Sequence, residues 1–306
     1  MRILVVGAGA VGGFIGGRLV QAGREVDFLV RPGRAAQLRE TGLRIVDGES
    51  VEKFDVNGLT VETLAGPYDL VLLCVKPESL PAVLDDIAPA VGEGTALVPF
   101  LNGMKHVDLV SDRYPEAALG GVVKIVAHLE SNGDIRQLLP GGRIDIGELD
   151  GAVTERVTAI EKALSIPGFA VTVPLDIVNA MWSKWVMIAT IGAVTSLVRG
   201  TTGEAAAVVG GSGFTEQVLD EAASIAAAAG HPLSEKDLAE HRGLATAAGL
   251  HLTSSLSREL LAGRVTEVEN VLGDLIDRAR GFGLSVPRLD AAALTLRVHN
   301  ARTASA

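Results

Sequence analysis

The chain has a single cysteine, Cys74, among its 306 residues. One cysteine excludes an internal disulfide and is typical of a reducing compartment, so we expect a cytoplasmic protein. Cys74 lies within the apolar run Leu70–Val75, where we expect it to be a small buried hydrophobic residue.

Basic residues are also scarce. The chain has 27 lysines and arginines against 37 aspartates and glutamates, which gives a formal net charge of −10. Because such a chain repels a phosphate backbone, we exclude nucleic acid as a general partner. An anionic small molecule stays possible, since it responds only to the charges near its own site.

The sequence offers neither a signal peptide nor an apolar segment that approaches a membrane span, so we predict no membrane partner. Hydrophobic residues make up 48% of the chain, which is enough to bury a large core. His241 and His251 lack the spacing of metal ligands, and we predict no metal site.

The first thirty-one residues carry the most informative pattern. Ile3–Val6 is a short apolar run, which suits a strand buried on both faces. A glycine motif with the spacing G-x-G-x-x-G follows at 7–12, then a helical pattern over 11–21 and a second strand over 25–30. Strand, glycine turn, helix and strand in this order predict a dinucleotide-binding unit.

Each glycine of this motif has a mechanical role. Gly7 allows the tight turn, Gly9 lets the backbone approach a pyrophosphate, and Gly12 lets helix and strand pack closely. The pyrophosphate would accept hydrogen bonds at the positive end of the helix, around Ala10 and Val11. We therefore predict that these five residues bind a cofactor; the alternative is a merely structural glycine turn.

The end of the second strand indicates which cofactor is bound. NAD sites usually place a carboxylate there for the ribose 2′-hydroxyl, whereas NADP sites use an arginine for the 2′-phosphate. Asp27 lies too early for the first role, while Arg31 ends the strand and Arg34 follows it. A guanidinium matches the oxygens of a phosphate, so we predict NADP(H); the alternative is that these arginines are only solvated loop residues.

Further strands of the first half end at polar residues. Lys76 follows the apolar run that contains Cys74, and Asn102 and Gly103 follow the next strand, both at the carboxyl end where open α/β sheets bind ligands. We expect residues 35–67 to be rich in loops, with short strands around 43–46 and 54–56. The alternation over 143–146 predicts an antiparallel or edge strand.

After Pro174 the pattern becomes helical, and no convincing strand is found in residues 176–306. We therefore predict an α/β domain over 1–174, followed by an all-α domain over 175–306, with a ligand cleft between them. The expected helices cover 176–198, 203–230, 234–241, 244–262, 267–282 and 287–301.

Two residues of the helical half are candidates for acid–base chemistry. Lys184 stands between two tryptophans, and desolvation would lower its pKa into a useful range if it faced a cleft; the alternative is a snorkelling surface lysine. Thr266 and Glu269 form T-x-x-E, a capping box that would place Glu267 in the first helical turn. On these residues alone, Glu267 would be an acid that only matches the helix dipole.

Taken together, the motifs resemble the ketopantoate reductase (2-dehydropantoate 2-reductase) family. The glycine motif, VKP, LNGM, WSK, TSSL and TEVE occur in that family's order and approximate spacing over nearly the whole chain. The resemblance implies a Rossmann domain followed by a helical domain like the C-terminal domain of 6-phosphogluconate dehydrogenase. It also implies NADPH-dependent reduction of a small 2-keto acid to an alcohol, in pantothenate biosynthesis. The oligomeric state is left open, with a homodimer as one option.

The resemblance also implies roles for individual residues. Lys184 matches the family's general acid, which protonates the developing alkoxide and stabilises its charge. Glu267 matches the glutamate near the substrate hydroxyl, Ser255 the serine that binds the substrate carboxylate, and Asn102 an asparagine near nicotinamide and substrate. For the cofactor, Lys76 matches the family's lysine in the cofactor cleft, and Arg31 matches the arginine that binds the 2′-phosphate.

Three departures from the family pattern concern the substrate. Ile188, Leu252 and Leu272 stand where ketopantoate enzymes of the family carry asparagines. If these positions line the pocket, it has lost hydrogen-bond donors and gained apolar surface, so we expect a substrate more apolar than ketopantoate. Two other classes stay open: a non-catalytic NADP-binding regulator, and a different hydroxy-acid dehydrogenase with the same two-domain plan.

Overall fold

The computed structural model describes residues 1–305 and divides into two compact units. The sheet unit comprises Met1–Leu101 and His106–Ala180, and the helical unit comprises Asn102–Lys105 and the residues from Met181 onward. The division falls later than the expected boundary after Pro174, because the first turn of a long helix still belongs to the sheet unit. The side chain of Ile177 in that turn packs closely on Gly120 and Gly147.

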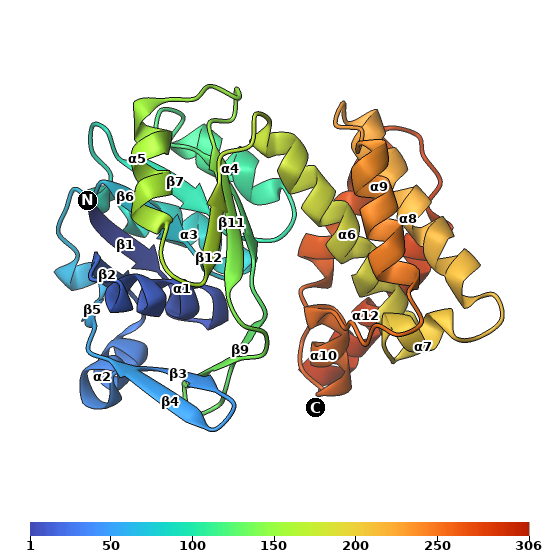
Figure 1. Ribbon diagram of the computed structural model, residues 1–306, viewed down its shortest axis with the longest axis horizontal. Coiled ribbons are helices and arrows are strands. Elements are labelled where there is room, and N and C mark those ends of the chain that lie inside the picture. The colour runs from blue at the N-terminus through green and yellow to red at the C-terminus, as the bar shows by residue number, and fades with distance from the viewer. Residues whose placement is uncertain (306) are drawn as a thin grey trace. The chain divides into compact units, whose positions relative to one another are not determined.

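The sheet unit alternates strands and helices in its first half and is mainly β in its second (Figure 1). Its strands are β1 (Arg2–Val6), β2 (Glu25–Leu29), β3 (Leu43–Asp47), β4 (Ser50–Phe54), β5 (Asn57–Leu59), β6 (Leu70–Leu73), β7 (Ala96–Pro99), β8 (Gly120–Lys124), β9 (Ala127–Leu129), β10 (Ile135–Gln137), β11 (Gly142–Gly147) and β12 (Phe169–Thr172). Its helices are α1 (Ala10–Gln21), α2 (Pro32–Thr41), α3 (Leu80–Asp86), α4 (Lys105–Arg113) and α5 (Glu155–Leu164), with short 3₁₀ turns η1 (Val61–Thr63), η2 (Pro77–Ser79) and η3 (Ala88–Ala90).

A five-stranded parallel sheet with the order β5-β2-β1-β6-β7 forms the core of this unit. In β1, Ile3 and Val5 pack into one hydrophobic cluster, and Leu4 and Val6 pack into a second cluster on the opposite face. Both faces of the strand are therefore buried, which is why its sequence is a continuous apolar run. The predicted Rossmann-like α/β fold is confirmed.

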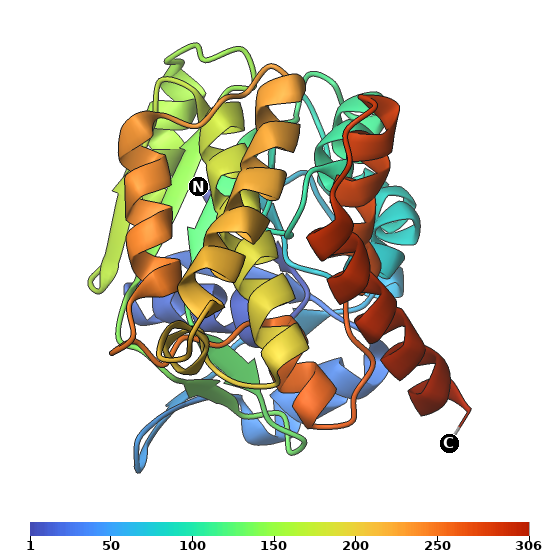
Figure 2. The same ribbon diagram turned by 90° about the vertical axis from the view of Figure 1, so that its right-hand side faces the viewer.

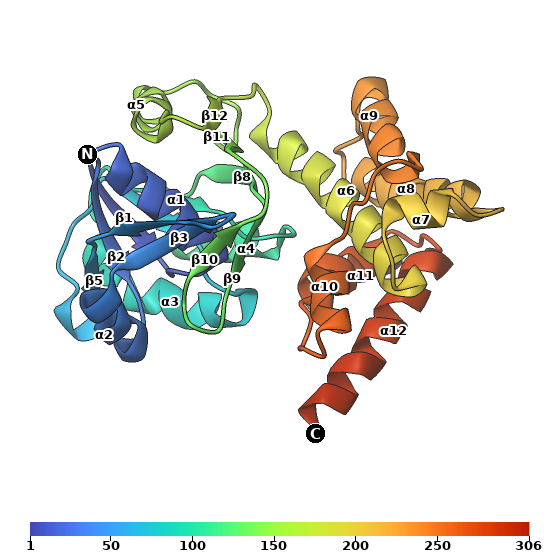
Figure 3. The same cartoon turned by 60° about the horizontal axis from the view of Figure 1, so that its bottom comes forward.

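Helix α1 is rich in glycine because it packs between two sheets (Figure 3). A Cβ at Gly16 would overlap the ring of Phe28 in β2, on the parallel sheet. A Cβ at Gly13 would overlap Ile135 of β10, in a second sheet with the order β4-β3-β10-β9. Glycine on both faces therefore lets each sheet approach the helix closely.

The expectation for residues 35–67 was only partly right. The strand expected near 43–46 is confirmed as β3, but the one expected near 54–56 lies earlier, as β4, and most of α2 and the strand β5 replace expected loop.

The alternating stretch 143–146 lies in β11, which pairs antiparallel with β8, so the antiparallel alternative is confirmed; β11 is the central strand of the sheet β12-β11-β8. Ile144 and Ile146 are buried, and so is Asp145 between them, whose carboxylate accepts a hydrogen bond from Arg143 at 2.8 Å.

The helical unit contains no strand among its described residues, as predicted (Figure 2). Its helices are α6 (Ile177–Val198), α7 (Thr202–Ala206), α8 (Gly211–Ala228), α9 (Glu235–Thr246), α10 (Ser255–Leu261), η4 (Glu269–Gly273, a π-helix), α11 (Asp274–Gly281) and α12 (Pro287–Ala304). The expected helix over 203–230 is two helices, because Gly210 turns the chain with a φ of +84°. The expected helix over 244–262 is also wrong, since α9 ends at Thr246 and α10 begins only at Ser255.

Helix α6 corrects the expectation that no segment approaches a membrane span. By length and composition alone this 22-residue helix could cross a membrane, with a mean hydropathy of 1.3 over its most apolar window. Within that window, 56% is buried inside the protein, as in the core helix of a globular domain. Its apolar character therefore has an explanation in the packing of the helical unit.

Candidate functional site

The glycine motif forms the turn between β1 and α1 at the carboxyl edge of the parallel sheet. Gly7 has a φ of +98°, a left-handed backbone conformation that is strained for residues with a side chain. Its N–H donates a hydrogen bond to the carbonyl of Leu29 at 2.9 Å. A Cβ at Gly12 would overlap the carbonyl oxygen of Gly7 and would lie 2.8 Å from the Cβ of Cys74. The turn and the close helix–strand contact that the motif predicts are both present.

The first turn of α1 offers a site for an anion. The helix begins at Ala10, and the N–H groups of Ala10, Val11 and Gly12 belong to the first turn, where no intrahelical acceptor exists. A Cβ at Gly9 would meet no atom within 4 Å, so the space beside this backbone is open. The residues therefore fit a pyrophosphate that accepts hydrogen bonds from the helix N-terminus.

The arginines after β2 have different surroundings. Arg31 precedes α2, is exposed, and donates from Nη2 to Oγ of Ser79 at 3.4 Å. Arg34 is half-buried and donates to the carbonyl oxygens of Ala8 at 3.2 Å and Gly133 at 3.0 Å, and burial lowers its pKa. Arg34 therefore braces the glycine turn, and Arg31 is the arginine available to a ligand at this edge.

Asp27, the acid of β2, is occupied elsewhere. Its carboxylate accepts hydrogen bonds from Nδ2 of Asn57 at 2.7 Å and from the hydroxyl of Tyr68 at 2.6 Å. These two contacts hold the Asp27 side chain within the sheet. The desolvated Tyr68 hydroxyl has a raised pKa, so it stays a donor toward this acid.

Lys76 lies in the loop between β6 and η2, where its side chain is exposed. Cys74 directly follows β6 and is partly buried rather than fully buried as expected, and burial raises the pKa of its thiol. Because β6 neighbours β1, this loop lies at the same sheet edge as the glycine turn. The loops after β1, β2 and β6 thus bring the predicted cofactor residues of the sheet unit to one edge.

Lys184 lies near the middle of α6 in the helical unit. Trp182 and Trp185 beside it are buried, whereas Lys184 itself is only partly buried. Ile188 follows one turn later on the same helix face and is also partly buried. The indole N–H of Trp185 donates to the carbonyl of Val271 at 2.8 Å, which fixes this part of α6 to the π-helix η4.

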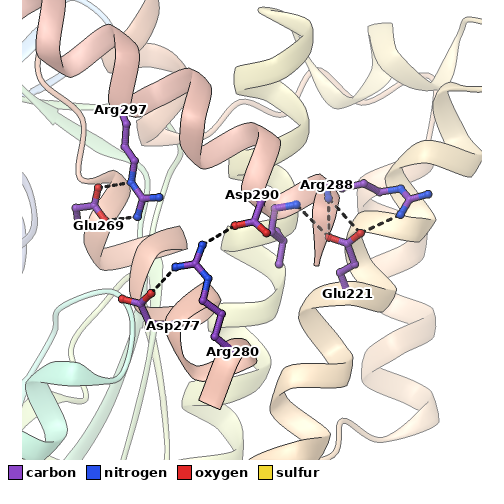
Figure 4. A network of polar contacts seen from close by, with 8 residues as sticks. Glu221, Glu269, Asp277, Arg280, Arg288, Asp290 and Arg297 are labelled. Carbon is purple, nitrogen blue, oxygen red and sulfur yellow. Dashed lines mark hydrogen bonds and ion pairs between the residues drawn. The ribbon is translucent and has the colours of Figure 1, made fainter. Parts of the chain in front are cut away.

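The capping box predicted for Thr266 and Glu269 does not form. Glu267 lies outside the helix, which begins at Val268, and Thr266 and Glu269 do not cap it. Glu269 instead accepts two hydrogen bonds from Arg297 of α12, at 2.7 and 2.6 Å (Figure 4). A charge-assisted bidentate pair is a stronger partner for a carboxylate than a single backbone N–H.

Ser255 and Asn102 both belong to the helical unit. Ser255 is the exposed first residue of α10, whose cap is Ser254; Ser254 lies 3.0 Å from Thr195 of α6, oxygen to oxygen. Asn102 is grouped with this unit by packing, although it follows a strand of the sheet unit in the chain. Its carbonyl accepts a hydrogen bond from Nδ2 of Asn270 at 2.6 Å.

The candidate residues of the helical unit are thus connected through their neighbours. Trp185 connects the helix of Lys184 to η4, Ser254 connects Ser255 to α6, and Asn270 of η4 connects to Asn102. Sequence reasoning missed Asn270, Arg297 and Asn300, and no motif could have found them because their partners are distant in sequence. The π-helix was also missed, since its residues look like an ordinary helix.

Two other features contain none of these residues. In the described part of the chain, no group of three or more histidines, cysteines, aspartates and glutamates is arranged to hold a metal ion. A wide hollow of about 700 Å³ on the helical unit, between α6, α8 and α12, is lined mainly by apolar side chains.

The whole chain is similar to known oxidoreductases. Residues 3–151 match the family "Ketopantoate reductase PanE/ApbA", and residues 176–300 match its C-terminal domain. An oxidoreductase of Bacillus subtilis, YkpB, is 32% identical over 98% of this chain and 99% of its own length. The 2-dehydropantoate 2-reductase of Halobacterium salinarum is 27% identical over 94% of this chain and 95% of its own.

Solved structures share the fold. The 2-dehydropantoate 2-reductase of Methylococcus capsulatus matches with a TM-score of 0.84 and 25% identity, over 99% of this chain and 98% of its own. A D-mandelate dehydrogenase in complex with NADH and anilino(oxo)acetate matches with a TM-score of 0.88 and 20% identity, over 99% of this chain and 100% of its own.

Proposed function

Since this chain belongs to the ketopantoate reductase family, we propose that it reduces the ketone of a 2-keto acid to an alcohol, with NADPH as the hydride donor. The observation that supports the proposal is that Lys184, Glu267, Ser255 and Asn102 all belong to the helical unit. Hydrogen bonds between neighbours of these residues tie their segments together.

Each of these residues has a step in the proposed reaction. When bound, NADPH supplies a hydride to the carbonyl carbon. The Lys184 ammonium gives its proton to the carbonyl oxygen, so that a hydride and a proton together convert the ketone to an alcohol. Before that transfer the charge on Lys184 stabilises the developing oxyanion. Ser255 binds the substrate carboxylate, Glu267 orients the hydroxyl that forms, and Asn102 orients the substrate.

We propose NADP(H) rather than NAD(H) because of the residues after β2. Arg31 is exposed and stands where a 2′-phosphate would need a cation, while Asp27 is held by Asn57 and Tyr68. Lys76, exposed after the neighbouring strand β6, adds a second positive charge at this edge. The D-mandelate dehydrogenase of the same fold was solved with NADH, so both nucleotides belong in the test.

We propose a substrate that is more apolar than 2-dehydropantoate. Ile188 and Leu252 are partly buried, so each presents some aliphatic surface in the helical unit, whereas Leu272 is fully buried. The D-mandelate dehydrogenase of the same fold was solved with anilino(oxo)acetate, an oxo acid with an aromatic substituent. The fold can therefore house such a substituent. The alternative within the same reaction is 2-dehydropantoate itself, in cytoplasmic pantothenate biosynthesis.

A substrate screen tests this proposal. NADPH oxidation is measured with 2-keto acids graded from hydroxylated to aliphatic and aromatic, and again with NADH. We expect the highest kcat/KM with an apolar 2-keto acid and NADPH, and a shift toward 2-dehydropantoate in the double variant Ile188→Asn/Leu252→Asn. If the unaltered chain turns over 2-dehydropantoate most efficiently, the apolar-substrate proposal is wrong while the reductase proposal stands.

A further inference from the structure

The turn that carries Glu267 is fixed to α12 on its N-terminal side by Asn300. The backbone N–H and the hydroxyl of Thr266 both donate to Oδ1 of Asn300, at 2.8 and 3.1 Å. In return, Nδ2 of Asn300 donates to the carbonyl of Thr266 at 3.0 Å. Thr266 is buried, so these three hydrogen bonds leave the residue before Glu267 little freedom.

The C-terminal side of the same turn is also fixed to α12. The Glu269 carboxylate meets the Arg297 guanidinium in a two-pronged contact (Figure 4). This hydrogen bonding lowers the pKa of Glu269, so the pair stays charged near neutral pH. Glu267 therefore lies between two residues that are both held by α12.

The π-helix η4, which begins at Glu269, also contacts the turn that contains Asn102. Asn270 in η4 donates its side-chain amide to the Asn102 carbonyl at 2.6 Å. Its own backbone carbonyl faces Gly103, where a Cβ would lie only 2.6 Å from that oxygen. Gly103 has a φ of +82°, so both its conformation and this contact require glycine.

We propose that Asn270 is a positioning residue that fixes the Asn102 turn relative to Glu267. Residues 102–105 pack with the helical unit although their neighbours in the chain, Leu101 and His106, pack with the sheet unit. The hydrogen bond from the Asn270 side-chain amide to the Asn102 carbonyl holds this turn against η4. The inference rests on the proposed function, in which Asn102 and Glu267 face one substrate.

The predicted effect is on catalysis more than on binding. Replacing the amide by a carboxylate removes the donor and sets like partial charges against each other at the Asn102 carbonyl. A misplacement of about 1 Å is enough to cost up to about a hundredfold in rate. We expect Asn270→Asp and Asn270→Ala to lower kcat at least about tenfold, with the KM for NADPH changed by less than about threefold.

The test combines steady-state kinetics with amide hydrogen exchange. Exchange of residues 102–105 should speed up in Asn270→Asp and Asn270→Ala. The control is Gln21→Ala, which removes a comparable side-chain amide donor bond, to Glu52 at 2.8 Å between α1 and β4, and should leave both kcat and this exchange unchanged. Having two variants guards against poor folding of one, which thermal unfolding would detect.

The two arms separate this inference from the proposed function. Faster exchange with reduced kcat supports the positioning role. Unchanged exchange, or unchanged kcat in well-folded variants, overturns it. If the unaltered protein reduces no 2-keto acid, the proposed function fails, and the exchange measurement still decides whether Asn270 holds the turn.

Discussion

Trp185 donates its indole N–H to the backbone carbonyl of Val271 at 2.8 Å. The donor is the residue after Lys184, and the acceptor lies in the π-helix that follows Glu267. One buried hydrogen bond therefore sets the distance between the two segments that carry the proposed acid–base residues. π-helical turns occur frequently at functional sites, and this one is fixed where such a site is proposed.

Removing this bond should affect both stability and rate. In Trp185→Phe the buried Val271 carbonyl loses its hydrogen-bond donor, so we expect the free energy of unfolding to fall by about 2 kcal/mol. Because α6 can then shift against η4, kcat should fall while the cofactor KM stays within about threefold. Chemical denaturation and steady-state kinetics measure the two effects. A loss of stability with full kcat would show that the bond does not position Lys184.

The same substitution, glycine to alanine, should affect different properties at two positions of the glycine motif. A Cβ at Gly12 would overlap the Gly7 carbonyl and crowd Cys74, so Gly12→Ala should lower stability by about 1–3 kcal/mol. A Cβ at Gly9 meets no protein atom within 4 Å, so Gly9→Ala should fold normally but weaken nucleotide binding. Thermal unfolding and nucleotide titration distinguish the two. Unchanged nucleotide affinity in Gly9→Ala would argue against a pyrophosphate at this turn.

Cofactor preference should depend on Arg31. Removing a guanidinium from a 2′-phosphate eliminates charge-assisted hydrogen bonds, so Arg31→Ala should raise the KM for NADPH at least about tenfold and leave that for NADH nearly unchanged. Arg39→Ala, an exposed arginine in α2, is the matched control and should change neither. Equal losses with both nucleotides would mean that Arg31 does not contact the 2′-phosphate.

Stability should fall in acid through Glu148. This buried carboxylate accepts hydrogen bonds from Arg156 and Thr154, and mainly the Arg156 bonds lower its pKa. A lowered folded pKa means that its stabilisation is complete above the unfolded pKa of about 4.3 and disappears as the pH falls through the folded value. Glu148→Gln should therefore unfold more easily by about 2 kcal/mol at pH 7, and the difference should shrink below about pH 4. A difference that stays constant from pH 7 to pH 3 would contradict this.

The sequence predicts the fold around the glycine motif well because the determinants of that fold are local. The strand of Ile3 to Val6, the turn at Gly7 and the helix from Ala10 are neighbours in the chain, so spacing alone defines their geometry. The fold of the helical unit follows in outline from its apolar periodicity. The sequence did not, however, predict α7, α10 and η4 as elements separate from their neighbouring helices.

The environment of the proposed catalytic residues could not be predicted. The T-x-x-E pattern at Thr266 and Glu269 favoured a capping box, but Asn300 and Arg297 of a distant helix bind these side chains instead. Likewise, Asn102 follows a strand in sequence but packs with the helical unit. Tertiary partners far away in the chain override local patterns, and one sequence contains no signal for them.

The most direct test of the account is the rate of NADPH oxidation by the Lys184→Ala variant with the best 2-keto acid substrate. Losing a positioned general acid should lower kcat by about 10²–10⁴-fold in a protein that still folds and binds NADPH. The control Lys236→Ala, an exposed lysine of α9, should keep full activity. Full activity in Lys184→Ala would contradict the proposed mechanism.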